Sequence, residues 1–155
     1  MSLHIVARVG GEHLAFPAAD VEEAVDAPAI EWVPAAPEGM LGQLAYRGRM
    51  VGAWDAGWLF RFAAPAAGGA ALLVRDGERR FALVVDDVTE MVRIEPAQLR
   101  ATPQGADADG VLSGIWFRAR RRVGRAGTPL VNVVRVDALA ARVSRSGTLV
   151  DGVTP

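Results

Sequence analysis

LAFPAADVEEAV, residues 14–25, is the stretch that determines the fold, because a close copy returns as FALVVDDVTEMV at residues 81–92. Identical residues align the two copies: Ala15, Asp20, Val21, Glu23 and Val25 recur as Ala82, Asp87, Val88, Glu90 and Val92. Two copies are too few for a solenoid, which needs at least about three stacked units. The repeat therefore predicts a duplicated compact β-unit, with a binding surface where the two halves meet.

Short strands separated by glycine turns extend outward from both copies. A turn signal precedes each copy, Gly10-Gly11-Glu12 in the first and Asp76-Gly77-Glu78 in the second. The sequence predicts strands over residues 3–9, 13–17, 21–25, 42–47, 49–54, 71–75, 79–85, 88–94, 111–118 and 130–135. No long helix separates successive strands, so the pattern favours small barrels over a doubly wound parallel sheet.

Helix signals are few and short, which makes the fold class mainly β. Asp55 is predicted to cap a helix that runs through Phe60, and one helical turn is predicted near residues 96–99. A last amphipathic helix is predicted over residues 136–143, where Asp137 matches Asp55 of the first half. Between the two copies, residues 63–70 are expected to form a solvated linker rich in Ala, Pro and Gly.

Composition excludes several functional classes. The chain has 155 residues, no cysteine, and no lysine among its 17 basic residues, which excludes disulfides, thiol chemistry, a P-loop lysine and a Schiff base. A net charge of −1 gives no overall attraction to nucleic acid or to an anionic membrane. The least polar stretch, residues 63–74, is broken by Pro65 and is too short to span a bilayer. With no export signal visible, the cytoplasm is the expected location.

No arrangement of reactive side chains indicates an enzyme. His4 and His13 flank one predicted hairpin without facing each other, so no metal site is expected. Asp86 and Asp87 would point to opposite faces of a strand, so they are not expected to share a reacting centre unless a bulge intervenes. A strand exit and turn is the favoured interpretation of the pair. Ser113 lacks a G-x-S-x-G elbow, and no dinucleotide or Walker motif occurs. We therefore expect no catalytic residue and no cofactor.

One arginine-rich segment leaves an alternative function open. Five arginines occur close together, at Arg118, Arg120, Arg121, Arg122 and Arg125, and such a run can bind phosphates. The segment lies at an expected hairpin tip and is followed by Gly127-Thr128-Pro129, which favours a solvated loop. A nucleic-acid-binding β-barrel that uses this loop is the alternative from a different functional class.

Ordered motifs along the chain carry a family resemblance. They are Val33-Pro34, Pro37, the run GQLAYRGRMV at residues 42–51, and Asp55. Together they resemble the signature of the CheW family. The segments 20–25, 85–92 and 130–133 are similar to that family's Val-x-Glu-Val/Ile element, its second-half counterpart and its final strand. The match spans roughly His4 to Val143.

The resemblance implies a fold and a function. The expected fold is a single CheW-like domain over residues 1–155, with two small SH3-like five-stranded β-barrels related by the repeat. One subdomain is expected at roughly 14–70 with terminal elements, and the other at roughly 71–135. The implied function is a non-enzymatic adaptor of bacterial chemotaxis. It would link the tip of methyl-accepting receptors to the histidine kinase CheA, through CheA's own CheW-like regulatory domain.

The resemblance also implies partner-binding residues. Val21, Glu23, Gly42 and Arg47 match receptor-facing positions of the family, where a receptor helix would lie in an apolar groove. Val21 is equally suited to core packing. Ala45-Tyr46 replaces the usual Asn-Leu of the family, so the chain is a divergent member on this interpretation. A scaffold of a twitching or other non-flagellar signalling system is therefore a second alternative.

Overall fold

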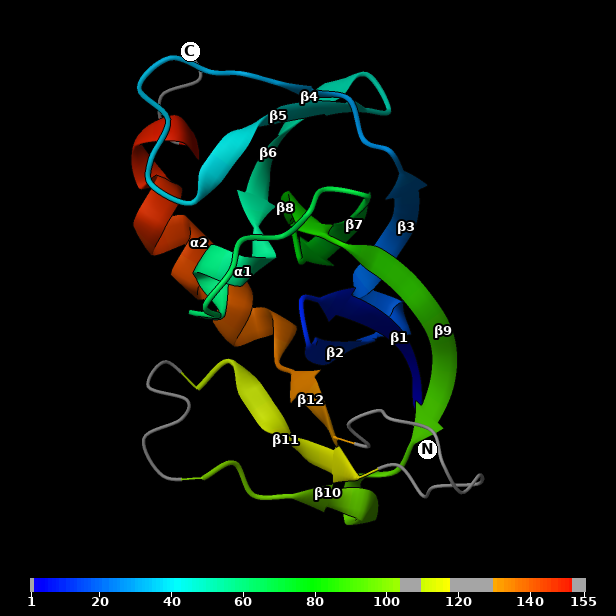
Figure 1. Ribbon diagram of the computed structural model, residues 1–155. Helices are drawn as coiled ribbons and strands as arrows, with labels where there is room; N and C mark the ends of the chain where they lie inside the picture. Colours follow the sequence, from blue (N-terminus) through cyan, green and yellow to red (C-terminus); the bar gives the residue numbers. More distant parts are fainter. Residues whose placement is uncertain (1, 104–109, 118–129, 152–155) are drawn as a thin grey trace.

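The computed structural model describes residues 2–103, 110–117 and 130–151, and these form two stacked sheets with helices on one side (Figure 1). The strands are β1 (Ser2–Val9), β2 (Glu12–Pro17), β3 (Val21–Asp26), β4 (Ile30–Glu31), β5 (Met40–Tyr46), β6 (Arg49–Asp55), β7 (Ala70–Asp76), β8 (Arg79–Val85), β9 (Asp87–Ile94), β10 (Leu99–Arg100), β11 (Leu112–Phe117) and β12 (Leu130–Val134). The helices are α1 (Ala56–Leu59) and α2 (Val136–Asp151), with 3-10 turns η1 (Ala18–Asp20) and η2 (Pro96–Gln98). The predicted mainly β fold is confirmed. The arginine-rich segment, residues 118–125, lies outside the described residues.

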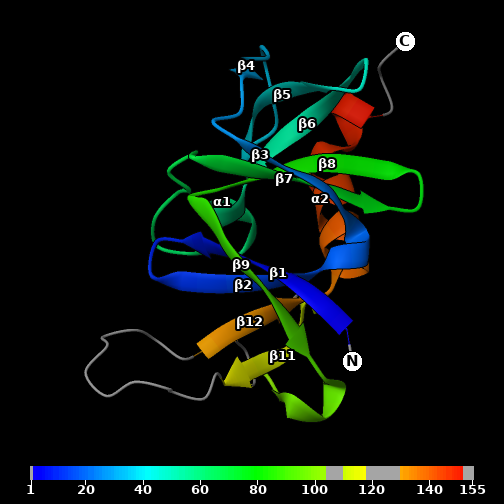
Figure 2. The ribbon, with the colours of Figure 1, turned by 90° about the vertical axis from the view of Figure 1, so that its right-hand side faces the viewer.

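Each sheet takes strands from both copies of the repeat. The lower sheet of Figure 1 has the order β10-β11-β12-β2-β1-β9, and the upper sheet has the order β3-β7-β8-β6-β5-β4. The first repeat copy contains β2 and β3, and the second contains β8 and β9. Each copy therefore begins in one sheet and ends in the other. Figure 2 shows β9 crossing from the upper sheet to the lower one.

This exchange changes where the two halves divide. The expected division lies near residue 70, yet β7 and β8, which follow it, pair with β3 and β6 in the upper sheet. The hairpins β1–β2 and β7–β8 each form the middle of a sheet. The strand after each hairpin leaves to pair with the other hairpin, so that β3 joins β7 and β9 joins β1. The upper sheet is thus one continuous segment, residues 21–85, whereas the lower sheet combines residues 2–17 with residues 87–134.

The sixth strand of each sheet is a two-residue edge strand, which the strand pattern alone did not predict. β4 pairs with β5 beside Gly42, and β10 pairs with β11 beside Gly114. Both glycines follow a register shift and have positive φ, 151° and 157°. A Cβ on Gly42 would lie 2.1 Å from the carbonyl oxygen of Glu31, and one on Gly114 would lie 2.7 Å from that of Arg100. The edge strands can approach because these glycines have no side chain.

Strand alternation divides the apolar side chains among three cores. Along β8, Leu83 faces the central core between the sheets, whereas Ala82 and Val84 face the interior of the upper sheet. Along the corresponding β2, Phe16 faces the central core and Ala15 faces the interior of the lower sheet. Most of the large, fully buried side chains belong to the central core. Apolar burial therefore stabilises the contact between the halves more than either half alone.

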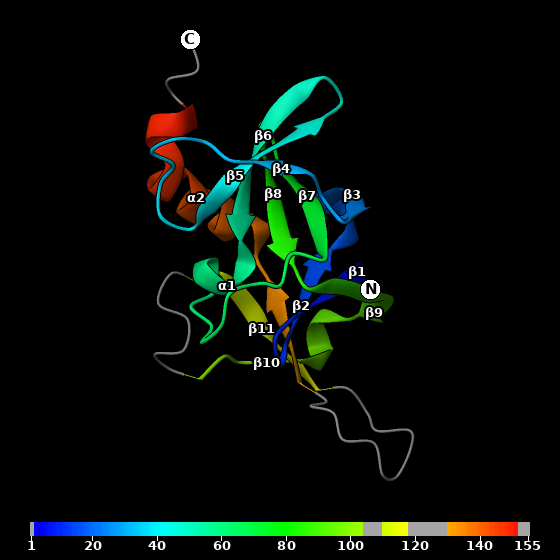
Figure 3. The same cartoon turned by 45° about the horizontal axis from the view of Figure 1, so that its top comes forward.

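Both helices cover the same side of the central core. α1 follows β6 and α2 follows β12, which occupy corresponding places in the two sheets. Figure 3 shows α2 running along the side of the upper sheet, with α1 close to it. The buried positions of α2, which are Val136, Leu139, Ala140 and Val143, follow the spacing of one helix face. The helix continues well past residue 143, where the sequence predicted its end.

Candidate functional site

Two of the four residues predicted to contact a receptor, Glu23 and Arg47, lie near Tyr46 of the upper sheet. Val21 and Glu23 lie at the start of β3, and Arg47 lies in the turn between β5 and β6. Glu23 and Arg47 are exposed, and both act electrostatically on Tyr46. Gly42 lies further along β5, where it is buried against β4. The curvature of the upper sheet thus brings its edge strand β3 near β5.

The turn that carries Arg47 is a two-residue hairpin loop. Tyr46 pairs with Arg49, and Arg47 and Gly48 between them have φ values of 48° and 75°. Positive φ at both loop positions is typical of a type I′ turn. The guanidinium of Arg47 lies over the Tyr46 ring, 5.2 Å from its centroid. This cation–π contact orients the exposed guanidinium at the hairpin tip.

Charged neighbours surround Tyr46 at this end of the sheet. Burial raises the pKa of Tyr46 above its ordinary value; Arg47 opposes the rise, and the carboxylates of Glu22 and Glu23 add to it. Glu22 is held in an ion pair with Arg80 of β8, at 2.6 Å. Glu23, one residue on, is exposed. The site therefore presents one carboxylate on β3 and one guanidinium of opposite charge in the β5–β6 turn.

Val21 lies where the central core reaches the surface. Both Val21 and its repeat counterpart Val88 on β9 are partly buried and pack against the central core. A bulge interrupts the strand pairing next to each of them. Core packing and surface exposure are thus combined in Val21. An apolar partner that lies across the junction of the sheets would meet both valines.

Gly42 contributes to this site only through the backbone. Its Cα is covered by β4, whose Glu31 carbonyl occupies the space that a Cβ would need. The sequence assigned Gly42 to a receptor contact through its match with the family motif. Its geometry gives Gly42 a structural role in the pairing of β4 with β5, and the receptor contact stays a prediction.

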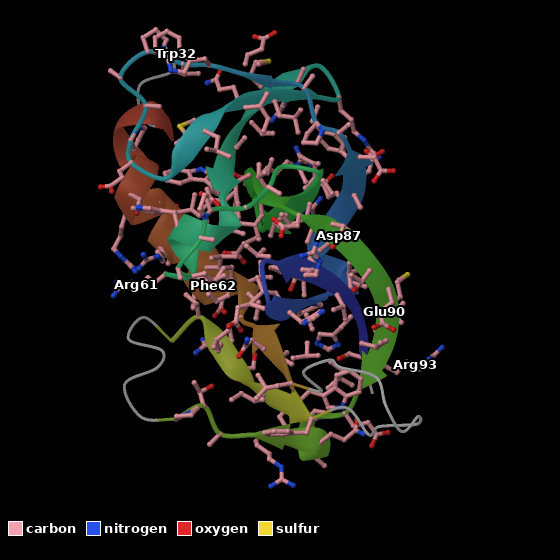
Figure 4. All side chains as sticks on the ribbon, viewed as in Figure 1. Trp32, Arg61, Phe62, Asp87, Glu90 and Arg93 are labelled. Atoms are coloured by element: carbon pink, nitrogen blue, oxygen red, sulfur yellow. The ribbon has the colours of Figure 1, made fainter. Side chains whose placement is uncertain are left out.

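An exposed apolar strip on β1 and β9 was not predicted from the sequence. Met91 is 57% exposed and Leu3 is 39% exposed, and their strands are paired, with Leu3 opposite Arg93. Figure 4 shows Glu90 and Arg93 along the same outer side of the molecule. One feature of the sequence could have indicated this strip: the second repeat copy has Met91 where the first copy has the much smaller Ala24.

Asp86 ties the two copies of the repeat together. Its carboxylate accepts hydrogen bonds from the backbone N–H of Gly10, at 2.7 Å, and of Ala67. It also pairs with Arg8 at 3.3 Å. Burial opposes ionisation, but these three contacts outweigh it and hold the pKa of Asp86 below its ordinary value. The carboxylate therefore joins the β1–β2 turn, the linker and the end of β8.

Asp86 and Asp87 lie at the predicted strand exit and turn, where their carboxylates do not diverge. Both carboxylates reach the same Arg8 guanidinium, Asp86 at Nη1 and Asp87 at Nε, at 3.3 Å and 3.2 Å. Asp86 lies in a bend between β8 and β9, so the strict alternation of an extended strand does not apply there. Through Arg8, the two carboxylates connect the bend between β8 and β9 to β1.

Asp20 is expected to destabilise the fold when it is ionised. Burial raises its pKa, and repulsion from Asp76 and Asp137 raises it further. A raised carboxyl pKa lowers stability above that pKa, and the penalty disappears as the pH falls through it and below about 3.9. Asp20→Asn should therefore raise the free energy of unfolding by about 0.5 kcal/mol at pH 7.

Urea denaturation at two pH values tests this expectation. The advantage of Asp20→Asn should be present at pH 7 and absent near pH 3, if the variants remain folded there. Asp26→Asn, at the exposed end of β3, is the control and should change little at either pH. An Asn variant that is less stable at pH 7 would contradict the repulsion argument.

The described part of the chain offers neither a metal cluster nor a membrane span. Residues 2–103, 110–117 and 130–151 contain no group of three or more His, Asp or Glu side chains that could hold a metal ion. Within the same residues, no helix is long and apolar enough to cross a membrane.

Comparisons with known proteins agree on one family. A family model described as "CheW-like domain" matches residues 4–144. The crystal structure of the scaffolding protein TtCheW from Thermoanaerobacter tengcongensis is similar, with a TM-score of 0.72 and 19% sequence identity over 89% of this chain and 91% of that chain. Altogether 15 chains of solved structures match, and a search of curated proteins finds none.

Proposed function

The chain belongs to the CheW-like domain family, and on that premise we propose that it is a non-enzymatic adaptor of bacterial chemotaxis. In this role it couples methyl-accepting chemoreceptors to the histidine kinase CheA. The family match over residues 4–144 spans both sheets, so the proposal concerns the whole described fold. The observation that supports it most is the proximity of Glu23 and Arg47, which both lie near Tyr46 of the upper sheet.

The receptor surface combines charge with an apolar junction. Arg47 and Glu23 offer opposite charges, while Val21 and Val88 offer apolar contact between the sheets. A receptor tip is a helical hairpin, and a helix binds by laying its apolar face in a groove with polar contacts at the rim. Such a transient interface is expected to be small, near or below about 1,200 Å² of total buried area.

The kinase contact uses a different surface in this proposal. Exposed apolar side chains lie around β4, β5 and β6, namely Trp32 at 78%, Leu41 at 41% and Met50 at 46% exposure. Apolar groups of this size on one region of a surface are typical of protein–protein contacts. We assign this region to the CheW-like regulatory domain of CheA. Both partners act in the cytoplasm, which is therefore the proposed location.

Direct binding measurements test the proposal. Calorimetric titration of the chain with a receptor-tip fragment and with the regulatory domain of CheA should show binding of each at micromolar concentrations. A ternary mixture should retain both partners, because the proposed surfaces differ. No binding of either partner at high micromolar concentration would refute the adaptor function. Partners from a twitching system in place of flagellar ones would support the non-flagellar form of the same function.

Arg47→Ala is expected to weaken binding of the receptor tip about tenfold. The substitution removes an exposed guanidinium whose hydrogen bonds to a charged or carbonyl partner contribute about 1.5 kcal/mol. The melting temperature should stay within about 2 °C, because a surface arginine contributes little to folding. Arg49→Ala, on the other side of the same turn, is the matched control and should bind normally. Equal binding by Arg47→Ala would remove Arg47 from the receptor surface.

A further inference from the structure

One face of β1 passes from the central core to the surface of the molecule. Ala7 is fully buried in that core, Ile5 is partly buried against it, and Leu3 is 39% exposed. These alternate residues share a face because successive side chains of a strand point to opposite sides of the sheet. The central core therefore reaches solvent along this face, toward the N-terminal end of β1.

The neighbouring strand β9 continues the same face. Residues directly opposite each other in an antiparallel pair lie on one side of the sheet, and Val88 is opposite Ala7 while Met91 is opposite Ile5. Val88 packs against the central core, whereas Met91 is 57% exposed. Met91 therefore lies on the exposed continuation of the apolar surface to which Val88 belongs.

The sulfur chemistry of this chain is limited to methionine. The sequence has no cysteine and four methionines, of which Met1 lies outside the described residues. Met40 is buried in the central core, whereas Met50 is 46% exposed. Met91 is thus the most exposed of the described methionines. An oxidant in solution has access to Met91 and Met50 and little access to Met40.

Hydrogen peroxide represents the class of oxygen-donating oxidants that convert a thioether to a sulfoxide. The sulfur lone pair attacks one peroxide oxygen, the O–O bond breaks, and the departing oxygen takes up a proton and leaves as water. Sulfur loses two electrons and the peroxide gains them. The product is a polar side chain with a strong hydrogen-bond acceptor, and sulfoxide reductases convert it back to methionine.

We propose that Met91 is a site of reversible oxidation, and that its sulfoxide weakens binding of the receptor tip. This inference rests on the proposed function, in which an apolar partner lies across Val21 and Val88. The thioether of Met91 extends that apolar contact, because it shares the face of Val88. The sulfoxide would lose its bound water in the same contact without gaining a partner, which is unfavourable.

Peptide mapping of the full chain after treatment with hydrogen peroxide tests the site. The sulfoxide should form at Met91 at least about five times faster than at Met40, because Met40 is buried in the folded chain. The same treatment in urea should remove the difference, since unfolding exposes both sulfur atoms. If Met91 reacts as slowly as Met40 in the folded chain, the assignment of the site is wrong.

Titration of the oxidised chain with a receptor-tip fragment tests the effect on binding. Oxidation of the unmodified chain should weaken binding about tenfold, and treatment with methionine sulfoxide reductases should restore it. The melting temperature should change by less than about 2 °C, because Met91 is exposed. A loss of binding that accompanies unfolding, or that the reductases do not reverse, would contradict the proposal.

Two leucine variants assign the effect to one residue. Met91→Leu keeps an apolar side chain of similar size and should bind the receptor tip equally well before and after peroxide treatment. Met50→Leu is the matched control, because it removes the other exposed methionine, which belongs to the region assigned to the kinase. It should lose receptor binding on oxidation as the unmodified chain does. Equal losses in both variants would exclude Met91 as the cause.

The titration also separates this inference from the adaptor function. If the untreated chain binds no receptor tip, the adaptor function fails, and the effect of oxidation on binding fails with it. If the untreated chain binds and the chain oxidised at Met91 binds equally well, the adaptor function stands and the role of Met91 is refuted.

Discussion

Gly42→Ala is expected to lower the free energy of unfolding by about 3 kcal/mol. A Cβ at this position would lie 2.1 Å from the carbonyl oxygen of Glu31, and the φ of 151° is one that other residues rarely adopt. The chain can accommodate alanine only by moving β4 away from β5 or by changing the bulge in β5. Thermal unfolding should show a decrease in melting temperature of roughly 6–12 °C for a chain of this length.

Two further glycine variants make this expectation specific. Gly114→Ala places a Cβ 2.7 Å from the carbonyl oxygen of Arg100 and should destabilise the lower sheet in a similar way. Gly52→Ala is the control, because its Cβ would meet the flexible end of Met40 at 3.1 Å and side-chain atoms of Trp54. It should change the unfolding free energy by less than about 1 kcal/mol. Normal stability in Gly42→Ala would show that β4 is not held as described.

The Gly42 variant also bears on the receptor surface. If Gly42→Ala loses receptor binding and stability together, the loss is explained by displacement of β4. If it folds normally and still loses binding, Gly42 contacts the receptor directly, as the family resemblance implies. The two outcomes therefore separate a structural role from a binding role at this position.

Asp55→Ala is expected to lower the free energy of unfolding by about 2–3 kcal/mol. The buried Oδ1 of Asp55 accepts hydrogen bonds from the N–H groups of Gly57 and Ala66, both at 2.8 Å. The first bond caps α1, and the second fastens the linker to the end of β6. Alanine would leave both N–H groups without their acceptor in a largely buried place. Urea denaturation monitored by tryptophan fluorescence measures the loss.

Matched aspartate variants test this argument. Asp55→Asn keeps an oxygen acceptor and should recover about half of the lost stability. Asp137→Ala removes an aspartate that is exposed in the first turn of α2, so it should change the free energy of unfolding little. Equal effects of Asp55→Ala and Asp137→Ala would show that Asp55 is an ordinary surface cap.

Local pattern explains why so many elements were predictable. β8 was predicted because a dense apolar run follows a glycine turn. Such a run is typical of a strand that is buried on both faces, and Leu83 and Ala82 do face different cores. Asp55 was identified as a cap because its side-chain oxygen and the helix after it are neighbours in the chain.

The linker between the two copies differed from the expectation. It was expected to be solvated, yet Ala66 is partly buried between two cores because Asp55 and Asp86 hold the backbone there.

The matching of the two halves was predictable in part. The repeat correctly related β2 and β3 to β8 and β9. Gly42 and Gly114 are a further matching pair, since each lies in the strand that pairs with a two-residue edge strand. It misplaced the match between Asp55 and Asp137. In the parallel pairings, Ala53 faces Ala82 and Val133 faces Ala15, which makes Arg135 the counterpart of Asp55. The two aspartates were matched because each lies near the start of a helix. The correct match depends on the register between strands that are far apart in the sequence.

The candidate site was also predictable only in part. The resemblance selected Arg47 and Glu23, and the fold brings both next to Tyr46, but their receptor role remains a prediction. Met91 and Leu3 were not selected, because exposure depends on which strand covers each face. A cavity beside Arg61 was not predicted either, because its lining residues come from α1, α2, β2, β11 and β12, which are far apart in the sequence.

The sequence by itself determined that the chain is a duplicated β protein, because residues 14–25 and 81–92 carry the same alternation and the same turns. It also determined most strands and the cap at Asp55, which depend on neighbouring residues. Only the tertiary structure decided that β3 and β9 exchange between the sheets, that Asp86 and Asp87 share Arg8, and that a cavity opens beside α1. Pairing of strands distant in sequence is selected by the burial of the whole central core, and no short stretch of residues contains that information.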